Sequence, residues 1–147
     1  MKISSEVRGR IEKVLESQKI AVLGTSMDDE PYSCLVGYAI TDDFRNVIFA
    51  TMRARLKYRN IVANPRVTLI VDNRDEMRSD FNETTSITMI GTAEDVMGED
   101  RGHYVDLLLK RHPVLSEFVD SPDCAIIKVS LDKMYIVSEF ESVIRIG

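Results

Sequence analysis

Apolar residues recur along the chain with two different spacings, and each spacing predicts one kind of secondary structure. Residues 3–17 have apolar positions every three to four residues, and Ser4 or Ser5 can cap them, which predicts an amphipathic helix. Residues 99–111 have a similar spacing, and the His112-Pro113 pair predicts the end of this second helix. The buried face of the second helix is expected to hold three residues: Tyr104, Leu107 and Leu108.

Shorter apolar runs, several of them alternating with polar residues, predict strands that are separated by turns and loops. Residues 28–31 form a predicted turn, and residues 41–46 and 72–83 form predicted loops. About six strands with few, peripheral helices predict a mainly β fold, a six-stranded antiparallel barrel in a single domain of residues 1–147. The runs that predict strands are 19–25, 32–40, 47–51, 66–71, 84–96, 125–129, 134–137 and 143–146.

The strand at residues 32–40 has one face of mostly small side chains. Gly37 on this face would allow another backbone or a flat ligand to approach closely. A glycine in a strand is equally typical of a bulge or of a bend in a barrel. The sequence leaves both interpretations open.

Positive charge is concentrated in the predicted strand, helix and strand between Val47 and Val71. No Asp or Glu occurs between Arg45 and Val71, although the whole chain has a net charge of −5. Such a cluster, placed where a strand leads into a helix, favours an anion site that includes the free N–H groups of the first helical turn. A solvated helix face whose charges pair with acids elsewhere explains the pattern equally well. The six basic residues are Arg45, Arg53, Arg55, Lys57, Arg59 and Arg66.

Composition excludes several classes of protein. No apolar run is long enough to span a membrane, and the charged N-terminus does not resemble a signal peptide, so we expect a cytoplasmic protein. An acidic chain without Trp is a poor candidate for binding nucleic acid. Cys34 and Cys124 lie in strand-like runs and are expected to be reduced core residues.

Motifs that carry chemistry are scarce. His103 and His112 have no acidic residues at metal-ligand spacing, so no metal site is predicted, and His112 is expected to have a structural role at a helix end. No nucleophile, Walker or dinucleotide motif occurs, and the catalytic residues are unknown. A phosphate site without an evident catalytic side chain is typical of proteins in which a cofactor supplies the chemistry.

The order and spacing of three segments resemble those of the pyridoxamine-phosphate-oxidase-like family of FMN-binding split β-barrels. These segments are Val47–Thr51 with the basic helix after it, Asn64–Val67, and Ser86–Glu94 with its Gly-x-Ala-Glu ending. The His112-Pro113 break before a final pair of strands is also similar to the family. The resemblance runs from about residue 19 to residue 96 and more weakly to the end of the chain.

The resemblance implies flavin mononucleotide (FMN) bound at the interface of a homodimer. By position, Arg55 and Lys57 should bind the FMN phosphate, and Thr51 should contact the phosphate or the ribityl chain. Residues 33–36 should run beside the isoalloxazine ring, mainly through backbone groups. Leu56 and Ser86 depart from the family, which often has Arg and Gln there. The full set of implied cofactor-binding residues is Ser33, Cys34, Leu35, Val36, Ala50, Thr51, Arg55, Leu56, Lys57 and Ser86.

The implied function is an FMN-dependent oxidoreductase that passes hydride or electrons between a reduced donor and an unknown small-molecule acceptor. Pyridoxamine phosphate is not the expected substrate, because residues 140–147 lack the Arg-x-His motif of the true oxidases. One alternative is a haem-binding or haem-utilisation protein, suggested by the His112-Pro113 segment and residues 136–140. Another is a flavin carrier or redox sensor without turnover, and relatives also bind the deazaflavin F420.

A homodimer is also expected because a split barrel of this size would leave strand edges and apolar faces exposed. The candidate contacts are the Tyr104, Leu107 and Leu108 face and the strand around Val36. Either Arg74 or Arg78, in the loop that follows residue 71, is expected to reach the partner's side of the pocket.

Overall fold

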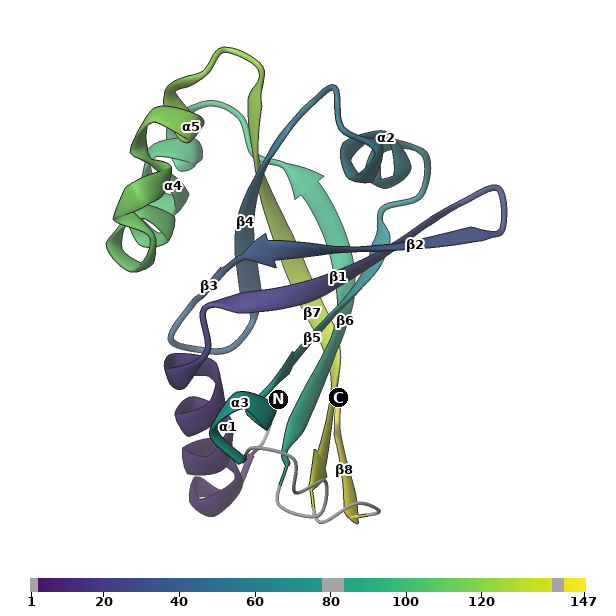
Figure 1. Cartoon of the computed structure of the whole chain (residues 1–147), viewed down its shortest axis with the longest axis vertical. Coiled ribbons are helices and arrows are strands. Elements are labelled where there is room, and N and C mark those ends of the chain that lie inside the picture. Colours follow the sequence, from purple (N-terminus) through teal and green to yellow (C-terminus); the bar gives the residue numbers. More distant parts are fainter. Residues whose placement is uncertain (1–2, 78–83, 139–141) are drawn as a thin grey trace.

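A single curled antiparallel sheet dominates the computed structural model, which describes residues 3–77, 84–138 and 142–147 (Figure 1). Six strands have seven or more residues, and β3 and β8 are shorter, which confirms the predicted antiparallel split barrel. The strands are β1 (Ile20–Met27), β2 (Glu30–Gly37), β3 (Ala39–Ile40), β4 (Asn46–Met52), β5 (Arg66–Asp72), β6 (Ser86–Asp95), β7 (Cys124–Ser138) and β8 (Ser142–Ile146). The helices are α1 (Ser5–Ser17), α2 (Leu56–Ala63), α3 (Arg74–Met77), α4 (Glu99–Arg111) and α5 (Ser116–Asp120), with a 3-10 turn at Pro113–Leu115.

The sheet curls because its two end strands are almost continuous in sequence. The strand order is β2-β1-β5-β6-β7-β4-β3, and β8 pairs with β7. Only Tyr38 separates β2 from β3 in the chain, so the first and the last strand of the sheet stay close to each other. The buried Tyr38 hydroxyl donates to the carbonyl oxygens of Leu15 (2.8 Å) and Gln18 (3.0 Å) at the end of α1. Burial raises the pKa of Tyr38 to about 12, so this hydroxyl stays a donor at neutral pH.

Two apolar clusters lie on opposite sides of the curled sheet. The larger cluster fills its inner side, where α1 contributes Ile11, Val14 and Leu15. Ser4 caps this helix by accepting from the Val7 N–H, as the sequence predicts. The smaller cluster packs α4 and α5 against β4 and β7, and it buries Leu108 completely. No helix in residues 3–77, 84–138 or 142–147 is long and apolar enough to cross a membrane.

The structure corrects three predicted boundaries. The strand at 32–40 is two strands, because the Tyr38 side chain is anchored to α1. The runs at 125–129 and 134–137 belong to the single strand β7, since the polar residues between them continue its pairing with β6 through a register shift. Part of the predicted loop at 72–83 is the short helix α3, which begins after Asp72 accepts a hydrogen bond from the Arg74 N–H.

Candidate phosphate-binding site

The basic segment lies where β4 leads into α2. β4 ends at Met52, and Arg55 is the N-cap residue of α2, with its N–H bonded to the Met52 carbonyl oxygen. No side chain in residues 3–77, 84–138 or 142–147 caps this helix with a hydrogen bond. The Tyr58 N–H donates to the Arg55 carbonyl oxygen, whereas the Leu56 and Lys57 N–H groups have no acceptor within the helix, so these two backbone donors can bind an anion.

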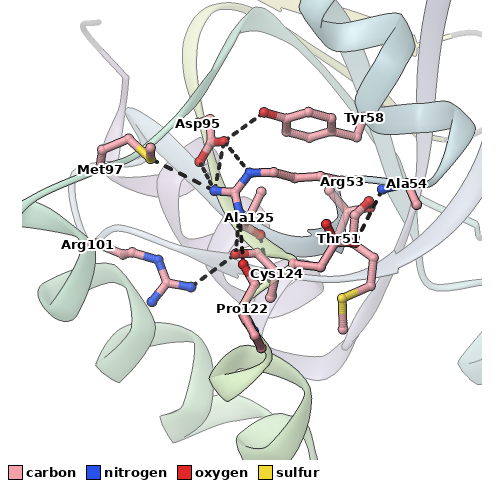
Figure 2. A network of polar contacts seen from close by, with 12 residues as sticks. Thr51, Arg53, Ala54, Tyr58, Asp95, Met97, Arg101, Pro122, Cys124 and Ala125 are labelled. Atoms are coloured by element: carbon pink, nitrogen blue, oxygen red, sulfur yellow. Dashed lines mark hydrogen bonds and ion pairs between the residues drawn. The ribbon is translucent and has the colours of Figure 1, made fainter.

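The Arg53 side chain is held in a network of polar contacts on the side of β6 and β7 (Figure 2). Its guanidinium donates to both carboxylate oxygens of Asp95, at 3.1 and 3.2 Å, and to the Cys124 carbonyl oxygen at 3.2 Å. The Tyr58 hydroxyl donates to the same carboxylate at 2.8 Å. This hydrogen bond, and then burial, raise the pKa of Tyr58. Arg53 is therefore neutralised within the chain and ties the start of α2 to the end of β6.

An Asp95→Asn substitution is expected to lower the free energy of unfolding by about 2 kcal/mol. The Arg53 and Asp95 side chains are only 28% and 19% exposed, so the guanidinium would lose its counter-charge in a poorly hydrated place. Tyr58→Phe removes one hydrogen bond and should cost about 1 kcal/mol. Urea unfolding of the three proteins tests this, and an Asp95→Asn protein as stable as wild type would show that water compensates Arg53.

Four of the five remaining cations of the cluster divide into two groups, and the fifth, Arg45, precedes β4, where its backbone N–H donates to the Asp43 carboxylate. Arg66 pairs with Asp132 at 2.8 Å across β5, β6 and β7. Arg55, Lys57 and Arg59 have no acidic partner among the residues that the structure describes. The interpretation that the cations pair with acids elsewhere in the chain is thus correct for Arg53 and Arg66. The start of α2 keeps positive charge that is not neutralised. Below, Arg55 and Lys57 are called the basic pair.

The inner face of β2 lies beside the basic pair. Burial raises the pKa of the half-buried Cys34 thiol, and the nearby charges of Lys57 and Arg55 lower it to a smaller extent. Of residues 33–36, Cys34 thus lies within the range of the charges at the start of α2. Val36 is buried in the core, whereas Leu35 is 67% exposed on the other face of β2.

Three further predicted residues lie differently. Thr51 is 1% exposed and its hydroxyl donates to the Met52 carbonyl oxygen, and its contact with a ligand stays a prediction. Ala50 precedes it and packs against the smaller apolar cluster. Ser86 lies at the opposite end of β6 from Asp95, roughly 30 Å away along a straight strand. One chain therefore does not bring Ser86 to the basic pair, and its contact with the cofactor stays a prediction.

The remaining expectations concern single residues. Arg74 forms an exposed ion pair with Asp72, and Arg78 lies outside the described residues. His112 is the C-cap residue of α4, and its Nε2 lies 2.8 Å from the Tyr38 carbonyl oxygen. The approach that Gly37 allows is made by the His112 ring, since a Cβ on Gly37 would lie 3.2 Å from the His112 Cε1.

The sequence did not predict the residues that hold α2, and with it the basic pair, against the sheet. Asp95, Tyr58 and the buried Asn60 were not predicted, because their contacts join residues far apart in the chain. The place of Asn60 next to the apolar Ile61 could have indicated that its side chain is buried, since both residues lie on the buried side of α2. No group of three His, Cys, Asp or Glu side chains in the described ranges is placed to hold a metal ion.

Solved structures share this fold at low sequence identity. A heme binding protein from Mycobacterium smegmatis superposes with a TM-score of 0.85 at 16% identity, over 100% of this chain and 59% of that chain. A Clostridium acetobutylicum protein of the pyridoxinephosphate oxidase family superposes with a TM-score of 0.76 at 16% identity, over 99% of this chain and 96% of that chain. A FAD-binding protein from Mesorhizobium loti superposes with a TM-score of 0.65 at 22% identity, over 88% of this chain and 90% of that chain. This chain thus spans about three-fifths of the mycobacterial protein.

Sequence comparison gives a firmer assignment than the shared fold. No curated protein sequence matches the chain significantly. The family model described as pyridoxamine 5'-phosphate oxidase matches residues 7–138, which include the whole of the site described above. The chain therefore belongs to the pyridoxamine 5'-phosphate oxidase family.

Proposed function

We propose that the protein binds FMN and acts as an oxidoreductase that passes hydride or electrons from a reduced donor to a small acceptor. The observation that carries this proposal is the basic pair, two cations at a helix N-terminus that have no acidic partner in the described part of the chain. An Arg fork, a Lys point charge and free N–H groups are a suitable donor set for a phosphate monoester. The family, and a FAD-binding protein of the same fold, support a flavin as the group that carries this phosphate.

When bound, FMN would supply the transfer of hydride or electrons, and the protein would supply binding and orientation. The basic pair would neutralise the phosphate. The Arg53–Asp95 pair would keep the first turn of α2 in place. The Cys34 thiol would remain neutral beside the site, because its pKa is raised. The mostly exposed strand β2 would offer backbone groups along the ring.

Haem binding is the second candidate, because a heme binding protein has the same fold over the whole of this chain. The sequence suggested His112 as a link to haem. Its Nε2 is engaged with the Tyr38 carbonyl oxygen, and its ring packs on Gly37, so an iron ligand at Nε2 would require this contact to break. The observation therefore argues against His112 as an iron ligand.

The visible spectrum of the purified protein tests the proposal directly. The absorption bands of an oxidised flavin, together with release of FMN when the protein is denatured, would support the proposal. A Soret band would support haem. Reduction of the bound flavin by NADH or NADPH, followed by reoxidation over many cycles, would identify an enzyme. A flavin that is bound but never turns over would identify a carrier or sensor.

We also propose a homodimer with FMN at its interface. The Tyr104 and Leu107 side chains pack against the smaller apolar cluster of their own chain. The outward face of β1 and β2 is a better contact surface, since Ile20 is 58% exposed and lies on the same face as the exposed Leu35. Sedimentation at micromolar concentration should give a dimer, and a monomer that still binds FMN would contradict an interface site.

A further inference from the structure

A pocket of about 510 Å³ lies where α1, the loop between β3 and β4, and the end of α4 meet. This volume falls within the range of pockets that bind small molecules, roughly 300–1,000 Å³. Both helices lie on the left in Figure 1, whereas α2 lies at the upper right. The described residues that line this α1–α4 pocket belong to neither the basic pair nor β2, so the pocket is separate from the candidate phosphate-binding site.

Two arginine side chains join the walls of the α1–α4 pocket. Arg8 in α1 donates to the Asp42 carbonyl oxygen at 2.7 Å, and its guanidinium carbon lies 4.6 Å from the centre of the Phe44 ring. Arg111 in α4 donates to the Leu15 carbonyl oxygen at 3.0 Å, near the end of α1. All five residues line the pocket, so these contacts hold its three walls together without a ligand.

The two helices line the pocket with opposite charges. On α1, Glu12 and Glu16 are four residues apart and share one face, and on α4 the lining cations are Lys110 and Arg111. Glu12 pairs with Arg8 at 3.2 Å. Glu16, Lys110 and Arg111 have no ion-pair partner among the described residues. A carboxylate and two cations thus line one pocket without pairing with each other.

The pocket also has apolar walls. Leu15 and Phe44 line it and are buried, while Ile40 and Leu107 line it and are partly exposed. These four residues come from all three elements that form the pocket. An apolar group placed against them is removed from water together with their remaining exposed surface, which favours its binding.

We propose that the α1–α4 pocket binds a small zwitterion with a branched apolar side chain, namely an apolar α-amino acid. The ammonium group of the ligand pairs with Glu16, and its carboxylate pairs with Lys110 and Arg111. Its side chain packs on Ile40 and Leu107. An ammonium group alone would leave the two cations unpaired, and a carboxylate alone would leave Glu16 unpaired. This site is independent of the proposed flavin site and goes beyond the proposed function.

Leucine and three compounds that each lack one of its groups test the inference on the wild-type protein. The compound 4-methylpentanoate lacks the ammonium group, 3-methylbutylamine lacks the carboxylate, and glycine lacks the side chain. In NMR titrations, leucine should bind at least about threefold more tightly than each of them, and the amide signals of residues 8–16 and 107–111 should shift. The inference is overturned if leucine does not bind saturably, or if any of the three compounds binds as tightly as leucine.

Variants assign the two charged contacts to residues of the pocket. Glu16→Gln should at least halve the preference for leucine over 4-methylpentanoate, and Lys110→Gln should at least halve the preference for leucine over 3-methylbutylamine. Both side chains are exposed, so neither substitution should prevent folding. Lys13→Gln is the matched control, because Lys13 is an exposed residue of α1 outside the pocket wall, and it should keep both preferences. Wild-type preferences in the Glu16 and Lys110 variants would contradict the inference.

The same titration distinguishes this pocket from the phosphate site. A protein with both Arg55→Ala and Lys57→Ala should bind leucine as wild type does, since neither residue lines the α1–α4 pocket. This result would support a second, separate site. A loss of leucine binding in that protein would place leucine at the start of α2 and would overturn the inference.

Discussion

A protein with Arg55→Ala and Lys57→Ala together is expected to bind FMN at least about 100-fold more weakly than wild type. Each cation lacks an acidic partner among the described residues, so its contact with a phosphate would be charge-assisted and worth about 1.5–3 kcal/mol. Each contact thus corresponds to a factor of about 10 to 150 in the dissociation constant. Fluorescence titration with FMN measures this loss.

Riboflavin, which lacks the phosphate, is the matched ligand control, and its affinity should hardly change. Arg59→Ala is the matched protein control, because it removes an exposed cation from the same helix and should weaken FMN binding by less than about threefold. Equal losses for FMN and riboflavin would indicate a damaged fold. Unchanged FMN binding in the double variant would show that the basic pair is only a solvated helix face.

Gly91→Ala is expected to destabilise the protein by about 3 kcal/mol or more. The register of the β6–β7 ladder shifts between Ile90 and Gly91, and the two backbones approach closely there. A Cβ on Gly91 would lie 2.2 Å from the Ser130 carbonyl oxygen and 2.8 Å from its carbon. Because both atoms belong to the backbone, a strand must move rather than a side chain. The midpoint of urea unfolding measures the effect.

Gly9→Ala is the matched control for that substitution. Gly9 lies on the exposed side of α1, and an added Cβ would meet nothing within 4 Å. Alanine in the interior of a helix should therefore stabilise the protein by about 0.5–1 kcal/mol. A Gly91→Ala protein with the stability of wild type would contradict the close approach at the bulge.

Local patterns predicted much of the fold, because the apolar spacing of a helix or strand is a property of neighbouring residues. The helix at residues 99–111 has the predicted bounds, and the Ser4 cap follows from its place before the first apolar turn. The split of residues 32–40 could not be predicted, since it depends on contacts of Tyr38 with a helix more than a dozen residues away.

The candidate site was predictable only up to the charge cluster. The sequence shows the six cations but not which acids pair with them. Asp95 and Asp132 approach Arg53 and Arg66 only when β5, β6 and β7 lie side by side. Which cations remain for a ligand is therefore a property of the sheet topology. The hydrogen bond from Asn60 to Thr25 was hidden for the same reason, since it forms where α2 packs on β1.

The long strand β7 has a consequence for the order of folding. Its first half pairs with β4 and its second half with β8, while β6 lies along its other edge. Apart from the two-residue strand β3, β4 therefore has no neighbour in the sheet until residues 124–130 have been synthesised. Pairing across so many residues is slow, because a large loop must close before any contact forms. During synthesis the β1–β2 hairpin can form early, whereas the β4 edge depends on the last third of the chain for its protection from other strands.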